Sequence, residues 1–539
     1  MNGSFKNSVV LVKFIVRRER VISLIWIALL VFITLAVAPA LNTLMTSQSD
    51  ISEMAAIMEN PAMKAMIGPV YGIESYNVGK MFANEMLLFT IITVGIMNIF
   101  FVSRHTRKDE EKGRVEVTRS LPVGRLSNLN AALISAAALN VILAVLTGLG
   151  LAALGIESMD FNGSMLYGAA LGVSGLFFAA LTAVFAQLCS NSSGTVGFSF
   201  ITMAVLYLIR AAGDVNSEVL SLISPMGLIL RVQVYHKNDW FPVFILILEA
   251  VAIVAVSFAL NRIRDVGQGF IPAKPGRKTA SVFLKSPLGL ALRLTKTTII
   301  GWIIGMFVLG ATYGSIMGEN SMKSFLEGNE YFQTMLGVTG SEAAEALIRQ
   351  FIVFILLITA LIAVVPVFTI MLRVRKEEVR GRAEGILASA VSRTRYLAGY
   401  FGIAVISSAV MLFMGAFGLW LSCAAVTANP MGFNEILKAI MAYLPAILVM
   451  LGFLTLIIGI LPDKTIMAWI YFGFSFFVVY IGRLMNLPGW VKRLTPFGYI
   501  GQYPAEEINA LNLLLLSAIF VCASALGFMH YRSRDLMNR

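Results

Sequence analysis

Two short charged blocks, far apart in the chain, are the segments best suited to specific polar recognition. Residues 107–116 read RKDEEKGRVE and residues 375–384 read RKEEVRGRAE, which match at a constant offset of 268 residues. In each block a Glu precedes an Arg by four residues (Glu110 and Arg114, Glu378 and Arg382), a spacing that predicts an ion pair on a short helix. A glycine between the two then interrupts that helix.

The positive-inside rule explains Lys and Arg in such loops, but it does not require acids at matching positions. Repeated acids and bases therefore favour two equivalent docking surfaces for a partner over two merely solvated loops. The candidate docking residues are Asp109, Glu110, Gly113, Arg114, Glu116, Glu377, Glu378, Gly381, Arg382 and Glu384.

Four ionisable residues, Glu85, Arg210, Glu249 and Arg483, fall within long apolar runs. A charge inside a bilayer is costly and by default marks a pathway, a relay or a pairing. The two arginines occupy corresponding positions near the ends of their runs, where they can reach the interface or pair with Glu85 or Glu249. Since Glu249 is the only carboxylate near mid-membrane depth, the pattern favours ATP over an ion gradient as the energy source.

The sequence offers little other reactive chemistry. Three cysteines and three histidines are scattered along 539 residues, which excludes a disulfide framework and predicts no metal site. The stretch Gly276-Arg277-Lys278-Thr279 lacks the upstream glycine of a phosphate-binding P-loop and follows no strand. We therefore expect no cofactor and no ATPase in this chain, so that energy comes from a partner or an ion gradient.

Composition fixes the elements that must position these residues. With 58% hydrophobic and only 13% charged residues, the chain cannot be a soluble protein and is expected to be an all-α polytopic membrane protein. Runs of about 20 apolar residues predict twelve transmembrane helices. They lie near 21–45, 81–102, 130–154, 166–189, 196–213, 241–262, 298–317, 350–372, 397–423, 437–462, 466–487 and 509–530.

Lys and Arg are distributed unequally between the two sides of these spans. With the N-terminus inside, the inner segments hold 31 of the 42 basic residues, which places both termini in the cytoplasm. The net charge of +12 thus reflects topology, and we expect no nucleic-acid partner.

The charged blocks directly follow the second and eighth spans, and other landmarks recur, including Trp26 with Trp302 and Tyr207 with Tyr480. Six spans followed by six of the same orientation predict two parallel six-helix repeats with a pathway between them. The expected domains are 1–262, a cytoplasmic linker at 263–297, and 298–539. Each half opens with an amphipathic stretch, at about 4–18 in the first half and within the linker in the second, suited to the headgroup layer.

These blocks, the following Leu121-Pro122-Val123-Gly124-Arg125, and Ile223-Ser224-Pro225-Met226-Gly227 resemble the membrane permease subunits of bacterial ABC-2-type exporters, the polyketide-antibiotic exporter family. The resemblance implies a type V exporter-like fold with an interfacial elbow helix, six spans and a coupling helix in each half. The coupling loops would be 103–129 and 373–396, and a short outer helical element would lie between the fifth and sixth spans.

The same resemblance implies a separate ATP-binding subunit, present in two copies, that binds ATP and Mg and docks on the coupling helices. One departure is Val379, which stands where the first copy has Glu111, so the two docking sites are expected to differ in strength. The implied location is the bacterial plasma membrane, in contact with its lipids.

By resemblance, the substrate route is lined by spans 2, 5, 8 and 11, which are rich in Met and aromatic residues. Such surfaces adapt to varied apolar ligands, although most individual residues of this kind pack between helices or against lipid. We expect a small hydrophobic or amphiphilic substrate. The candidate pathway residues are Phe89, Met97, Phe200, Met203, Tyr207, Phe354, Trp469, Phe472, Phe476 and Tyr480.

Two alternatives remain at this point. An ion-coupled secondary transporter of amphiphilic drugs would function without an ATPase and would depend on Glu249. A membrane-embedded enzyme would need clustered acids, bases or metal ligands at one membrane face, and the sequence has no evident nucleophile–base pair there. An exporter subunit driven by a bound ATPase is the leading hypothesis.

Overall fold

The computed structural model describes residues 3–44, 58, 61–271, 279, 281–315, 344–426, 431–480, 489–501 and 509–535. The chain divides into two compact units, Met1–Gly276 (unit 1) and Arg277–Arg539 (unit 2), and each is described by itself. Eleven helices in the described ranges are long and apolar enough to cross a membrane. The chain is therefore a polytopic, helical membrane protein.

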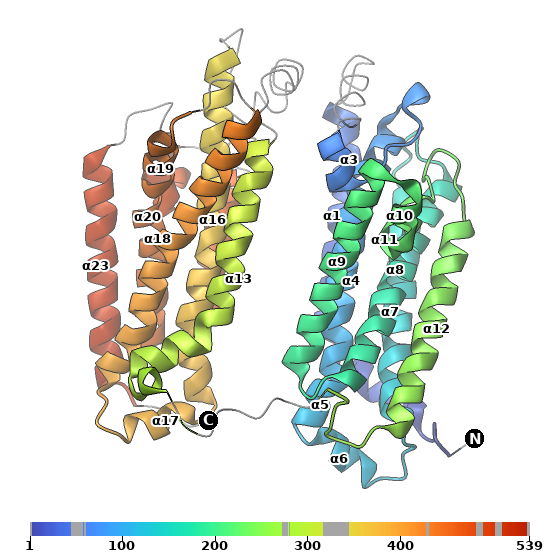
Figure 1. The fold of residues 1–539 in the computed structure, drawn as a ribbon, viewed down its shortest axis with the longest axis horizontal. Helices are drawn as coiled ribbons and strands as arrows, with labels where there is room; N and C mark the ends of the chain where they lie inside the picture. The colour runs from blue at the N-terminus through green and yellow to red at the C-terminus, as the bar shows by residue number, and fades with distance from the viewer. Residues whose placement is uncertain are drawn as a thin grey trace. The chain divides into compact units, whose positions relative to one another are not determined.

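Unit 1 is a bundle of long helices with short helices at both ends. The short helices α5 and α6 lie at one end of the bundle, and α3, α10 and α11 lie at the other (Figure 1). The elements are α1 (Ser8–Leu44), α3 (Pro61–Ile67), η1 (Ile73–Ser75), α4 (Val78–His105), α5 (Arg107–Glu111), α6 (Arg114–Arg119), α7 (Ser127–Ala153), α8 (Phe161–Leu188), α9 (Ser192–Asn216), α10 (Glu218–Ile223), α11 (Pro225–Leu230) and α12 (Phe241–Ile263).

Unit 2 has the same general plan, with α17 at one end of its bundle and α19 at the other (Figure 1). Its elements are η2 (Val282–Lys285), α13 (Pro287–Ser315), α16 (Ala344–Val379), α17 (Arg382–Leu387), α18 (Arg393–Val426), α19 (Phe433–Met441), α20 (Leu444–Ile460), η3 (Pro462–Lys464), α21 (Ile466–Tyr480), α22 (Gly489–Lys492), η4 (Pro496–Tyr499) and α23 (Ala510–Ser533).

Eleven of the twelve predicted spans correspond to membrane-length helices. The predicted span 466–487 is described only as α21, Ile466–Tyr480, and its remainder lies outside the described residues. At the start of unit 1 the structure differs from a separate amphipathic helix at 4–18, because α1 runs unbroken from Ser8 to Leu44. The physical reason is that no Gly or Pro interrupts the helix before Pro39.

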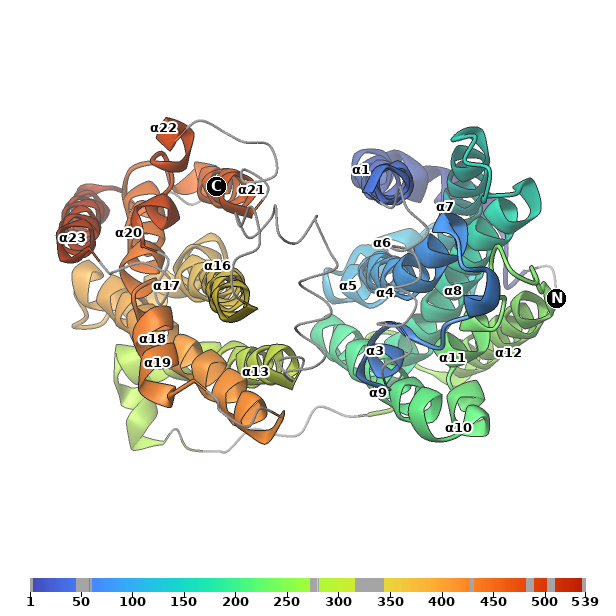
Figure 2. The same ribbon diagram turned by 90° about the horizontal axis from the view of Figure 1, so that it is seen from above.

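The fourth long helix of each bundle packs against several of the other helices. In unit 1, α8 packs against α4, α7, α9 and α12, and Figure 2 shows it among these neighbours. In unit 2, α20 packs against α16, α18, α21 and α23. Glycines permit the closest crossings, as a Cβ added at Gly168 would lie 2.2 Å from the backbone oxygen of Ala144 on α7. Gly168 thus allows close packing between α7 and α8.

Gly168→Ala should lower the stability of the protein by about 1–3 kcal/mol, because the new methyl group meets backbone that cannot rotate away. Unfolding in detergent, followed by near-UV circular dichroism, measures this change. Gly197→Ala is the matched control, since no atom lies within 4 Å of a Cβ added there. Equal stability of the two variants would show that the crossing of α7 and α8 is looser than described.

Candidate functional site: the two repeated charged loops

Each charged block turns at its glycine with nearly the same backbone geometry. Gly113, between α5 and α6, has φ 68° and ψ 5°, and Gly381, between α16 and α17, has φ 69° and ψ 4°. The Gly113 amide donates to the Glu110 carbonyl at 2.9 Å, and the Gly381 amide donates to the Glu378 carbonyl at 2.8 Å. This left-handed conformation favours glycine, which accounts for its repetition in the two blocks.

The first block contains a carboxylate that is bound by two arginines. Glu110 accepts hydrogen bonds from Arg264, with Oε1 to Nη2 at 2.5 Å and Oε2 to Nη1 at 3.0 Å. Its Oε2 also lies 2.6 Å from Nη1 of Arg107. Arg264 is the residue that ends α12, so this carboxylate ties the loop after α4 to the end of the last long helix of unit 1.

The second block repeats this arrangement. Arg534, the residue that ends α23, donates to both oxygens of Glu378 at 2.7 Å. The hydroxyl of Tyr531 donates to Glu378 at 2.6 Å, and Arg375 lies 3.4 Å from it. Each unit thus contains a buried carboxylate that joins its loop to the end of its last helix, and we call this contact the Glu–Arg lock.

Arg107 extends the lock in unit 1 to a third segment. Its side chain is almost fully buried and donates to the backbone carbonyls of Ser190 (2.8 Å), Gly267 (2.9 Å) and Gln268 (3.1 Å). Ser190 lies just after α8. In unit 2 the corresponding residue, Arg375, lies 2.5 Å from Asp463 in η3, just after α20. Both loops are therefore fixed to the segment that follows the fourth long helix of their unit.

The predicted pairs between Glu110 and Arg114 and between Glu378 and Arg382 do not form. Arg114 instead contacts Asp109 at 2.9 Å, and Arg382 contacts Glu377 at 3.4 Å. The reason is the left-handed glycine between acid and base, because it ends one helix and starts another, so the spacing of a continuous helix does not apply.

The candidate docking residues fall into two groups that the sequence did not separate. The acids that begin each block are largely buried and bound inside their own unit, so they hold the loops in place and present little surface to a partner. The exposed members are Arg114, Glu116, Gly381, Arg382 and Glu384. Val117 and Leu121 add apolar surface in unit 1, with exposed fractions of 69% and 58%.

The lock arginines, Arg264 and Arg534, were absent from the sequence prediction. The sequence does contain a repeat that indicates these two arginines. Arg262, Arg264 and Asp265 after the sixth span recur as Arg532, Arg534 and Asp535 after the twelfth span. A search for repeats restricted to the loops would have found it.

The ionisable residues within the spans have partners other than those expected. Arg210 is fully buried, lies 3.0 Å from Asp214, and donates to the carbonyls of Ala65 (2.8 Å) and Met66 (3.2 Å). Pairing with Glu85 or Glu249, one of the two options that the sequence left open, does not occur, because Arg210 binds the carbonyls at the end of α3 and a carboxylate four residues away.

The two carboxylates of this set have no ion-pair partner among the described residues. Glu85 is partly buried on α4, and its Oε1 has no hydrogen-bond partner in the described ranges. Glu249 is partly buried on α12. Arg483 lies outside the described residues.

The candidate pathway residues are divided between the cores and the surfaces of their units. Met97, Met203 and Phe354 are buried, and Phe89 and Phe476 have exposed fractions of 46% and 37%. The Tyr207 hydroxyl donates to the carbonyl of Met66 at 3.0 Å, so this residue helps to hold α3.

Three further pathway candidates contact other aromatic rings. Phe200 packs edge-on against Phe100 at 5.6 Å. Trp469 and Phe472 pack edge-on against Phe368, with ring centroids 5.3 and 6.2 Å apart. The backbone of Tyr480 ends α21. The contacts that the structure gives for these rings are packing contacts within one unit.

The described residues contain no cluster of three or more His, Cys, Asp or Glu side chains that could hold a metal ion. The polar chemistry of the described chain is instead concentrated at the helix ends, in the locks and in the contacts of Arg210.

Eleven apolar spans and two internally locked polar loops define a multi-pass membrane protein. A family profile described as "Multidrug efflux system permease Rv1217c, C-terminal domain" matches residues 12–262 and 284–532. The multidrug efflux system permease protein Rv1217c of Mycobacterium tuberculosis is 31% identical over 545 residues, which cover 99% of this chain and 96% of the relative. The chain belongs to this family of permeases.

Arg264→Gln should make Cys189 accessible to thiol reagents. Cys189 follows α8 beside the lock, and burial raises the pKa of its thiol, so the reactive thiolate is scarce at neutral pH. In a variant that retains only this cysteine, loss of Arg264 leaves Glu110 buried without its main partner and should open the loop. The maleimide labelling rate of Cys189 is expected to rise about tenfold or more. Arg262→Gln, an exposed position on the same helix end, should leave the rate unchanged.

Gly381→Ala should loosen the second loop by about 1 kcal/mol, because alanine is strained at a φ of 69°. Hydrogen exchange of the amides in 376–390, followed by mass spectrometry, should become faster. Gly385→Ala is a matched control, since neither glycine has an atom within 4 Å of an added Cβ and only Gly381 has a positive φ. Gly381→Asn should have a smaller effect, and equal exchange in all three variants would contradict the conformational explanation.

Proposed function

We propose that this chain is the membrane-spanning subunit of an ATP-driven exporter that moves hydrophobic or amphiphilic drug-like compounds out of the cell. A separate ATP-binding subunit, in two copies, docks on the loops at about 107–125 and 375–393 and binds ATP and Mg. The relative from Mycobacterium tuberculosis is named a multidrug efflux system permease, which supports export of drug-like compounds.

The observation that carries this proposal is the repeated loop geometry. Two loops with the same glycine conformation and the same lock suit two copies of one partner better than a single asymmetric protein. The chain itself has no P-loop, so hydrolysis belongs to the partner.

The lock also explains how force on the loop would reach the membrane. In unit 1, Glu110 and Arg107 connect the loop to the segments that follow α8 and α12, and α5 directly continues α4. A partner that moves the loop therefore moves the ends of three long helices together. In unit 2 the corresponding connections reach η3 and the end of α23.

The proposed location is the bacterial plasma membrane, with the loops and both termini in the cytoplasm, as the distribution of Lys and Arg favours. Membrane lipids surround the chain, and the substrate is a small amphiphile. The Met and aromatic residues of the spans would accommodate varied apolar shapes.

A second candidate function is ion-coupled drug transport, and one observation favours it. Glu85 is a carboxylate within a span, and its Oε1 has no hydrogen-bond partner among the described residues. A carboxylate inside the membrane by default marks a pathway or a proton relay. This alternative predicts transport without any ATPase and loss of transport in Glu85→Gln.

ATP hydrolysis by the purified chain in lipid nanodiscs, alone and with the ATP-binding protein encoded beside it, tests the proposal. We expect no hydrolysis by the chain alone, and vanadate-sensitive hydrolysis, stimulated by amphiphilic drugs, in a complex of two ATP-binding subunits with one permease. Proton-driven transport by the chain alone, without complex formation, would overturn the proposal in favour of ion coupling.

Glu116→Lys combined with Glu384→Lys should weaken co-purification of the ATP-binding subunits by about tenfold, because rim charges at an interface govern association. Both residues are exposed, so the fold of the permease should be preserved. Glu157→Lys, an exposed acid in the loop between α7 and α8 at the other end of unit 1, is the matched control. Unchanged co-purification of the double variant would remove the docking role from these loops.

A further inference from the structure

Glu85 is an acidic residue inside a membrane span that no described residue neutralises. It lies on α4, seven residues after Val78, the first residue of that helix, which is about 10 Å along the helix axis. Its side chain is partly buried, and its Oε1 has no hydrogen-bond partner among the described residues. Because a charge inside a bilayer is costly, an unpaired carboxylate at this depth indicates a functional site.

The polar side chains nearest to Glu85 along the chain are bound to other groups. The side-chain amide of Asn84 donates to the hydroxyl of Tyr76 at 3.4 Å. Lys80, the lysine closest to Glu85 in sequence, donates to the carbonyl and the hydroxyl of Ser75 at 2.7 and 2.6 Å. Within the described part of the chain, these contacts leave the carboxylate of Glu85 available to a ligand.

Glu85 stands at one end of an apolar stripe on α4. Phe89, Thr93, Ile96 and Phe100 follow it at spacings of three or four residues, which places them on one face of the helix. Phe89 and Phe100 have exposed fractions of 46% and 43%, and the two residues between them are partly exposed. The other helices of unit 1 therefore leave this face of α4 partly uncovered.

The corresponding helix of unit 2 has neither the acid nor the exposed face. The offset of 268 residues that relates the two charged blocks gives the corresponding positions of α16, which are Val353, Leu357, Leu361, Val364 and Phe368. All five are buried, with exposed fractions of 7% or less. The packing of such a bundle therefore does not require an acid or an uncovered stripe at these positions, which favours a binding role for them in unit 1.

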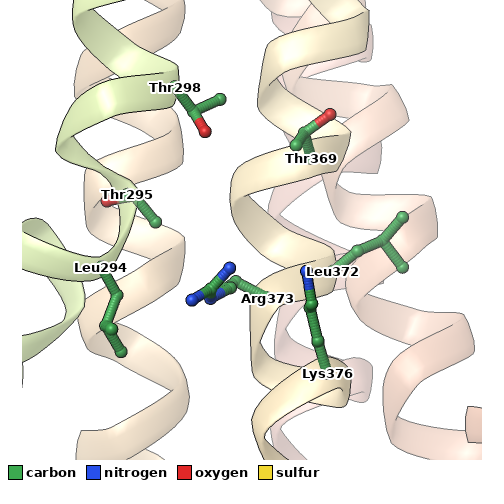
Figure 3. A pocket seen from close by; sticks show the side chains of 7 residues that line it. All are labelled: Leu294, Thr295, Thr298, Thr369, Leu372, Arg373 and Lys376. Atoms are coloured by element: carbon green, nitrogen blue, oxygen red, sulfur yellow. The ribbon is translucent and has the colours of Figure 1, made fainter. Parts of the chain in front are cut away.

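A cavity in unit 2 provides a contrast in charge. It has a volume of about 210 Å³, lies between α13 and α16, and is lined by Arg373 and Lys376 (Figure 3). Arg373 already pairs with Glu377 at 2.9 Å. Cationic side chains in its wall repel a cationic ligand, whereas the carboxylate of Glu85 attracts one.

We propose that Glu85 and Phe89 bind the positively charged group of an amphiphilic substrate, and that the stripe ending at Phe100 contacts its hydrophobic part. This inference rests on the proposed export function and names its preferred substrates as cationic amphiphiles, such as quaternary ammonium or phosphonium compounds. A carboxylate pairs with such a cation, and the face of an aromatic ring also attracts it. Both attractions are stronger inside a membrane than in water, because the dielectric constant is lower there.

Equilibrium binding of radiolabelled tetraphenylphosphonium to the full chain in detergent, without any ATP-binding subunit, tests the proposal. We expect one tetraphenylphosphonium to bind per chain. Triphenylphosphine oxide, a neutral compound with three of the same rings, should compete only at much higher concentration. Competition by the neutral compound at the same concentration as tetraphenylphosphonium would overturn the preference for cations.

Variants locate the binding. Glu85→Gln should weaken tetraphenylphosphonium binding about tenfold or more and leave the affinity for triphenylphosphine oxide unchanged. Phe89→Leu, at an exposed position, should weaken tetraphenylphosphonium binding about threefold. Glu249→Gln is the matched control, since Glu249 is also a partly buried acid within a span but has no aromatic residue three or four positions away. Unchanged binding in Glu85→Gln, or equal weakening in Glu249→Gln, would overturn the proposal.

Drug-stimulated ATP hydrolysis by the complex with the ATP-binding subunits separates this inference from the proposed function. In Glu85→Gln, stimulation by tetraphenylphosphonium should fall about tenfold, and stimulation by neutral drugs should persist. Equal stimulation by both kinds of compound in the wild type and in Glu85→Gln would leave the export function intact and overturn the role of Glu85. Loss of transport of cationic and neutral compounds alike in Glu85→Gln would instead assign this residue to a proton relay and overturn the inference.

Discussion

The architecture of both units depends on a buried carboxylate that must remain paired. Glu110 and Glu378 lie at helix ends where water reaches little of their surface. A buried charge without partners is costly, and removing one partner of a buried pair typically costs about 3–5 kcal/mol. Each carboxylate therefore requires its loop, the end of the last long helix and an arginine of its own block to stay together. This requirement fixes the loop relative to the membrane helices.

The locks are alike, but the surroundings of the two loops have diverged. In unit 1, Glu111 accepts from the backbone amide and the hydroxyl of Ser192 and so caps the start of α9 at 2.7 and 2.6 Å. Val379 occupies the corresponding position in unit 2 with an exposed fraction of 61% and cannot form this cap. The second loop instead reaches the segment before α21 through Arg375 and Asp463. A partner with two equal subunits would meet two loops with different contacts to their membrane helices.

The sequence predicted those features that depend on local composition. Apolar runs located eleven membrane-length helices, because a spanning helix must satisfy its backbone internally and cover itself with apolar side chains. The helices α1 and α13 begin 13 and 11 residues before the predicted spans at 21 and 298. The repeated blocks gave the two loops and their glycines. A break after the first amphipathic stretch was expected, but amphipathic residues do not end a helix without a Gly or Pro, and α1 continues through them.

Features that depend on distant contacts were not predictable from single segments. The partners of Arg210 include carbonyls of α3, which lie more than 140 residues earlier in the chain. No sequence pattern in α9, the helix that carries Arg210, indicates these partners. The burial of Glu110 could not be predicted from the sequence, because charge patterning alone does not distinguish an exposed acid from one that is paired with Arg264. Only the repeat at the ends of the sixth and twelfth spans carried that information.

The central claim is that each loop and the end of its last helix move as one body during transport. Replacing Glu110 and Arg264 with cysteines in a chain without other cysteines, and bridging them with a short bis-methanethiosulfonate reagent, tests it directly. The measurement is drug-stimulated ATP hydrolysis by the bridged permease with its ATP-binding subunits, before and after reduction of the bridge. Hydrolysis that is retained with the bridge and lost on reduction is the expected result. Hydrolysis that stops with the bridge and returns on reduction would show that the loop and helix must separate, and would contradict the claim.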